Sequence, residues 1–77
     1  MKESLLRRSR ARRRLMPAFA KAIRLEAQVT LAEMGEALDV TESTVSRWES
    51  GLRRPRGPLA ERYAQVLSRL ESEIRRG

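Results

Sequence analysis

The chain has 77 residues, no cysteine, no histidine and a formal charge of +7, and its length allows one small domain. Because it lacks cysteine and histidine, it has no disulfides, no thiolate nucleophile, and neither the commonest metal ligand nor the usual general base near neutral pH. The sequence therefore predicts a protein that is not an enzyme and holds no metal or other cofactor.

Residues 1–16 form a basic N-terminal arm. The arm carries a formal charge of +6, whereas residues 17–77 carry only +1. Such a segment favours a polyanionic partner, above all a nucleic acid, because each neutralised phosphate releases counterions. The alternative is a solvated tail or one attracted to a membrane surface. The arm lacks the apolar stretch of a secretory signal, and no apolar run in the chain could span a bilayer, so we expect a cytoplasmic protein without a membrane partner.

The sequence leaves two conformations open for the arm. It is either disordered until it enters a minor groove, or it extends the following helix backwards, since Leu5, Leu6 and Leu15 could form part of an apolar face. Arginine is favoured in narrow minor grooves, although the same charge would attract any polyanion, including RNA. The arm residues that we expect to contact the DNA backbone are Arg10, Arg12, Arg13 and Arg14.

Residues 17–77 are expected to be all-α. Helix formers dominate this part of the chain, and no stretch alternates apolar and polar residues over the length of a strand. Pro17 can occupy the first position of a helix over about 17–28. Thr30 and Glu33 have the spacing of a capping box, which predicts the start of a second helix over about 31–38.

Thr41 is the N-cap candidate for the next helix, over about 42–50, and Gly51 follows as its left-handed stop. Val45 and Trp48 would point into the core. Trp48 could instead stack on bases, but its spacing from Val45 favours the core.

A basic loop over 52–57 separates this helix from the last one, because Pro55 disfavours a helical residue before it. Pro58 then begins a helix over about 58–75. The expected fold is a compact bundle of four to five helices, with residues 17–77 as one helix-turn-helix domain behind the arm.

Two short helices joined by residues 39–41 have the spacing of a helix-turn-helix, in which the first helix braces the second across the major groove of DNA. Gly35 costs about 0.5 to 1 kcal/mol relative to alanine in a helix, so we expect a close approach of the backbone there. Asp39 lies where the turn often requires a left-handed residue, a conformation that aspartate tolerates less well than glycine.

Residues 23–55, IRLEAQVTLAEMGEALDVTESTVSRWESGLRRP, carry the pattern of a known family. Its signature pieces here are Arg24, Val29-Thr30, Met34-Gly35, Asp39-Val40-Thr41 and the run from Thr44 to Glu49 followed by Gly51. In this stretch the chain resembles the Cro and phage-repressor class of helix-turn-helix proteins, the XRE family, whose DNA-binding domain is lambda-repressor-like. The resemblance implies a sequence-specific transcriptional regulator of double-stranded DNA, a dimeric repressor that reads a palindromic operator through the major groove.

The family directs the exposed side of the helix over 42–50 at base edges. Arg47 has the chemistry to pair bidentately with guanine, a contact worth about 1 to 3 kcal/mol of discrimination. Glu42 can accept from cytosine, or it only favours the positive helix N-terminus. The expected base-reading residues are Arg47, Ser43, Glu42, Ser46 and Thr44. The expected backbone contacts outside the arm are Thr30, Thr41, Arg53, Arg54 and Arg56, although capping alone would explain the two threonines.

Three positions depart from the family pattern. The family commonly has a phosphate-contacting glutamine where this chain has Leu31, so that contact is absent or comes from elsewhere. Gln28 and Asp39 stand where the family usually has glycine, which puts the local turn geometry in question more than the fold.

Arg24 and Glu49 occupy positions that the family pairs. The resemblance implies a buried, bidentate ion pair that fixes the angle of the helix over 42–50. The alternative is an exposed pair worth less than about 1 kcal/mol.

The last helix carries an apolar stripe that ends in Leu70 and Ile74. These two side chains run beyond what so small a body can cover, so they are the expected contact of a homodimer, with a fraying exposed end as the alternative. A two-fold dimer would place two recognition helices about 34 Å apart on successive major grooves.

Two other functions stay open. Residues 53–67, RRPRGPLAERYAQVL, resemble more loosely a branch of small antitoxin-type regulators, many encoded next to toxins. This resemblance implies an antitoxin-like protein that binds a toxin partner and regulates its own operon. The basic arm also allows a basic RNA-binding protein.

Overall fold

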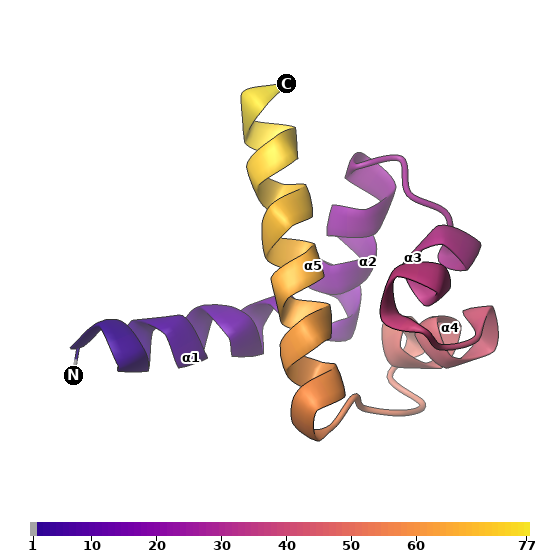
Figure 1. Ribbon diagram of the computed structural model, residues 1–77, viewed down its shortest axis with the longest axis horizontal. Helices are drawn as coiled ribbons and strands as arrows, with labels where there is room; N and C mark the ends of the chain where they lie inside the picture. Colours follow the sequence, from indigo (N-terminus) through magenta and orange to yellow (C-terminus); the bar gives the residue numbers. More distant parts are fainter. Residues whose placement is uncertain (1) are drawn as a thin grey trace.

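Five α-helices make up the computed structural model, which describes residues 2–77 and their side chains from residue 4 onward (Figure 1). They are, in chain order, α1 (Lys2–Arg14), α2 (Pro17–Glu26), α3 (Leu31–Leu38), α4 (Glu42–Ser50) and α5 (Gly57–Arg76). The all-α bundle that the sequence predicts is confirmed. None of the helices in this described part combines the length and the apolar composition that a membrane crossing requires.

The core lies where α2, α4 and α5 meet, and α3 closes it against α4 and α5. Met34, Val45 and Leu67 are almost fully buried there. Trp48 packs against Tyr63 with ring centroids 4.8 Å apart and planes tilted by 39°, a geometry that aromatic pairs favour. The core position predicted for Trp48 is therefore confirmed, and its ring is not free to stack on bases.

The arm forms a helix of its own, α1. Pro17 is the first residue of α2, and Met16 before it has an extended backbone (φ −63°, ψ 128°), because the proline ring disfavours a helical conformation in the preceding residue. The chain bends at this point, and α1 runs across α5 in a new direction (Figure 1). Neither of the two conformations that the sequence left open, a disordered arm or a longer α2, is the observed one.

The C-terminal end of α1 ties it to the rest of the bundle. Arg14 donates from Nε to the carboxylate of Glu71 in α5, and both side chains are about four-fifths buried. Leu15, just after α1, packs against the core. Leu5 and Leu6, in contrast, are 60% and 53% exposed. The apolar face suggested by the three leucines does not form, and the first turns of α1 project from the body (Figure 1).

The end of α5 is better covered than the sequence suggests. Leu70 and Ile74 are half-buried and pack against the core cluster, because α2 packs on α5 and runs beside its C-terminal half (Figure 1). These two side chains are thus partly covered within one chain, and their expected role in a dimer contact stays a prediction.

Three helices end in a residue with positive φ: Gln28 (58°), Asp39 (57°) and Gly51 (81°). After each of them the next N–H donates to a carbonyl five residues earlier, a bond typical of left-handed helix ends. The three bonds are Val29 to Arg24 (3.1 Å), Val40 to Gly35 (2.8 Å) and Leu52 to Arg47 (2.9 Å). The two departures from glycine therefore keep the left-handed geometry, at the cost that a side chain meets in this region.

Candidate nucleic-acid interface

The turn between α3 and α4 is built around Gly35. A Cβ at this position would lie 2.6 Å from the carbonyl oxygen of Val40 in the turn and 3.4 Å from the backbone nitrogen of Glu42. The close approach predicted from a glycine inside a helix is confirmed. Because Gly35 has no side chain, the turn can approach α3 closely. This approach sets the distance between α3 and α4 and so the position of α4.

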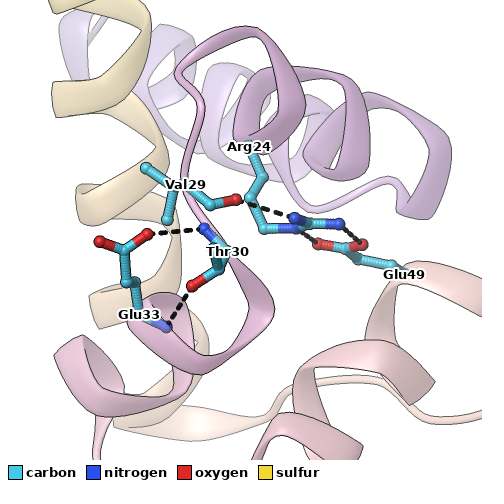
Figure 2. A network of polar contacts seen from close by, with 5 residues as sticks. All are labelled: Arg24, Val29, Thr30, Glu33 and Glu49. Carbon is cyan, nitrogen blue, oxygen red and sulfur yellow. Dashed lines mark hydrogen bonds and ion pairs between the residues drawn. The ribbon is translucent and has the colours of Figure 1, made fainter.

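Two threonines cap the helices of the motif. Thr30 accepts from the backbone N–H of Glu33 (3.0 Å), and the carboxylate of Glu33 accepts from the backbone N–H of Thr30 (2.9 Å), which confirms the capping box (Figure 2). The bond from the backbone N–H of Thr30 to the carboxylate lowers the pKa of Glu33 below its ordinary value. Thr41 accepts from the backbone N–H of Thr44 (3.1 Å), and the two hydroxyls lie 2.9 Å apart. Both caps are formed within the chain, so the expected phosphate contacts of Thr30 and Thr41 stay predictions.

Four of the five expected base-reading residues gather on one exposed side of α4. Glu42, Ser43, Ser46 and Arg47 are all exposed and line an open hollow of about 310 Å³. Their spacing places them on the same side of the helix, and we call these four residues the reading face. Within the described chain no ion pair engages Arg47, so its guanidinium is available to a ligand.

Leu31, which stands where the family commonly has a phosphate-contacting glutamine, lines the same hollow. It is half-buried and packs against the core cluster with part of its side chain. The sequence does indicate that Leu31 lies at the interface, because it follows the N-cap at the position where the family contacts DNA. Leucine cannot donate to a phosphate, but it offers an apolar surface that suits the methyl group of thymine.

Thr44 lies apart from the reading face. It is half-buried and lines a different hollow, of about 710 Å³, together with residues of the loop that follows α4. The exposed loop arginines, Arg53, Arg54 and Arg56, line this second hollow. The structure thus groups Thr44 with the expected backbone contacts, and the expectation that it reads a base is not supported by its position.

A buried ion pair holds α4 against α2. Arg24 donates from Nε and Nη2 to the two carboxylate oxygens of Glu49 (2.6 and 2.9 Å) and from Nη1 to the carbonyl of Val29 (2.8 Å; Figure 2). Only 7% and 5% of the two side chains are exposed. The hydrogen bonds to Glu49 raise the pKa of Arg24 above its ordinary value, although burial opposes this. Through these bonds Arg24 connects α2 with α4 and with the loop that follows α2. The ion pair therefore fixes the orientation of the reading face.

The hydroxyl of Tyr63 is buried beside this ion pair. It has no hydrogen-bond partner among the described residues, and only 1% of Tyr63 is exposed. Burial, assisted by the negative charge of Glu49, raises the pKa of Tyr63 to about 12. The folded protein therefore holds this proton more tightly than the unfolded chain, in which tyrosine titrates near pH 10.

The wild type is expected to lose stability above pH 10 because of Tyr63, and Tyr63→Phe is expected to abolish this loss. Below pH 10 both states are protonated, whereas between pH 10 and about 12 only the unfolded state loses the proton, which costs the wild type roughly 2 to 3 kcal/mol. Urea unfolding at pH 7 and pH 11.5 measures this difference. At pH 7 Tyr63→Phe should be as stable as the wild type or more so, because the unpaired hydroxyl is gone. A loss above about 1 kcal/mol at pH 7 would show that the hydroxyl has a partner.

The four arm arginines line three hollows. Arg10, Arg13 and Arg14 surround Glu71 of α5 in a hollow of about 280 Å³, where Arg14 is engaged in its ion pair. The sequence offers no local signal for Glu71, because it is 57 residues from Arg14. Arg12 shares one hollow with the loop after α4, and it lines another with Arg14 and with Glu61 of α5. Only Arg12 is thus next to other expected DNA contacts, and the roles of the remaining three stay predictions.

Comparison with known proteins agrees with this geometry. The family model described as helix-turn-helix, of the XRE or Cro/C1 type, matches residues 21–75, from α2 to the end of α5. No curated protein and no solved structure matches the chain. The matched residues include Gly35 with its turn, the reading face and the ion pair of Arg24 with Glu49. By most of its length, the chain belongs to the XRE family of helix-turn-helix DNA-binding regulators.

Proposed function

We propose that the protein is a sequence-specific repressor that binds an operator in double-stranded DNA as a homodimer and reads it through the major groove with α4. The observation that carries this proposal is the division of α4 into two sides. Glu42, Ser43, Ser46 and Arg47 are exposed on one side, whereas Val45 and Trp48 are buried on the other. A helix held in this way can enter the groove with its reading face towards the base edges.

Affinity and specificity come from different residues in this proposal. The loop arginines follow α4 directly and lie on the surface, where they can neutralise phosphates on any DNA sequence. The guanidinium of Arg47 can form two parallel hydrogen bonds with the O6 and N7 atoms of guanine. The choice of sequence therefore depends mainly on α4, a single helix of nine residues.

The homodimer is proposed because one short helix reads few base pairs. A second copy related by a two-fold axis doubles the reading surface and selects a palindromic site. Leu70 and Ile74 are partly buried against the core of their own chain, so only their remaining exposed surface is open to a dimer contact. Analytical ultracentrifugation with and without operator DNA tests the oligomeric state, and one copy per palindrome at saturation would contradict the dimer.

Arg47→Ala is expected to lower the ratio of specific to nonspecific DNA affinity by about 5- to 150-fold, which corresponds to about 1 to 3 kcal/mol of discrimination. The ratio is measured by titrating the operator and an unrelated duplex at the same stated salt concentration. Arg53→Ala is the matched control, because it removes the same charge from the loop and should weaken binding to both duplexes alike. If Arg47→Ala also weakens both alike, Arg47 does not read a base.

A further inference from the structure

We propose that Arg12 of α1 and Arg53 and Arg54 of the loop after α4 form one phosphate-binding site for the backbone of the bound DNA. This inference rests on the proposed function and deepens it, because it makes one particular arginine of α1 part of the interface. It also separates that arginine from the others on the same helix.

The three side chains line a single hollow of about 270 Å³ between the last turn of α1 and the loop. Its remaining lining is apolar or aromatic and comes from Leu15, Met16, Pro17, Trp48 and Pro55. No acidic side chain in the described part of the chain lines this hollow, and none of its arginines takes part in an ion pair there. Three positive charges thus face one space in which no acidic side chain takes part, although Arg12 also lines a hollow with Glu61 on its other side.

The hollow around Glu71, which is also rich in arginine, shows the contrast. Arg10, Arg13, Arg14 and Arg75 line it together with Glu71. The carboxylate of Glu71 accepts from Arg14 and lies 4.0 Å from Arg75. Part of the charge is therefore satisfied inside the protein, and we do not assign this hollow to a ligand.

The position of the Arg12 hollow identifies its ligand as a DNA phosphate. Trp48, Arg53, Arg54 and Pro55 line both this hollow and the larger one that begins at Thr44 of α4. A DNA strand that leaves the reading face along the loop arginines therefore passes over Arg12 next. Pro17 and Pro55 fix the backbone on the two sides of the hollow, and guanidinium groups match the geometry of a phosphate. Binding would then require little reordering of the protein.

The salt dependence of operator binding tests the site, because each phosphate contact contributes about 0.9 to the slope of log K against log salt concentration. Because Arg53 and Arg54 would still neutralise part of the same phosphate's charge, Arg12→Gln should reduce the magnitude of this slope by a part of the about 0.9 of one contact, and it should weaken specific and unrelated duplexes alike. Arg75→Gln is the matched control. It removes the same charge from the C-terminal end of α5, outside the Arg12 hollow, and should leave the slope unchanged. Thermal melts of both variants confirm that each is folded.

A double variant tests whether the arginines share one phosphate. If they do, Arg12→Gln combined with Arg54→Gln weakens binding by less than the product of the two single effects. The inference is overturned if Arg12→Gln leaves the slope unchanged, if Arg75→Gln reduces it equally, or if the single effects multiply. If one of these results is found while the wild type still selects its operator, only the inference about Arg12 fails and the proposed function stands. If the wild type selects no duplex sequence, the proposed function fails first.

Discussion

Glu49→Ala is expected to lower the free energy of unfolding by about 3 to 5 kcal/mol, because it leaves the buried charge of Arg24 without its partner. The guanidinium would keep only its bond to the carbonyl of Val29. Glu49 is 5% exposed and belongs to none of the hollows beside the reading face, so the change acts through the fold and the orientation of α4. Urea unfolding at pH 7 measures the loss.

Glu71→Ala is the control within the same protein. Its ion pair with Arg14 is about one-fifth exposed, and we expect its removal to cost about 1 kcal/mol or less. Comparable losses for the two variants would show that burial does not set the strength of these pairs. An unfolding curve for Glu49→Ala that superimposes on that of the wild type would contradict the role assigned to the Arg24 pair.

Gly35→Ala is expected to destabilise the protein by about 1 to 3 kcal/mol or more, although alanine is the better helix former by about 0.5 to 1 kcal/mol. The new Cβ would lie 2.6 Å from the carbonyl oxygen of Val40. This neighbour is backbone and cannot rotate away, so the turn between α3 and α4 must move. We expect weaker operator binding as well, since the movement displaces the reading face.

Glu36→Ala is the control for Gly35→Ala, because Glu36 is the next residue of α3 and is exposed. It should change the free energy of unfolding by no more than about 0.5 kcal/mol. A Gly35→Ala variant at least as stable as the wild type would show that the two helices have room for a side chain.

Local features of the domain could be predicted from the sequence. The caps at Thr30 and Thr41 and the left-handed stop at Gly51 depend on residues within one or two turns, and all three are confirmed. Gly35 could be predicted because a glycine inside a helix has a known cost. The sequence does not determine the left-handed ends at Gln28 and Asp39, since tertiary packing and not side-chain type decides φ at these two residues.

The structure of the arm could not be predicted. Leu5 and Leu6 suggest an apolar face, but both are exposed in the structure. The spacing of the leucines therefore does not show how α1 packs. Its anchor is Arg14 on Glu71, at the other end of the chain. The same limit applies to Leu70 and Ile74, which α2 helps to cover. Contacts between distant segments, which the sequence pattern does not contain, decide the outcome in both cases.

The central claim is that α4 reads a DNA sequence. A binding selection on random duplex DNA, at a stated salt concentration and followed by footprinting of the enriched site, tests it most directly. We expect one enriched motif with two-fold symmetry and two protected half-sites one helical turn, about 34 Å, apart. A pool that remains random after selection, while the protein binds RNA equally well at the same salt concentration, would contradict it.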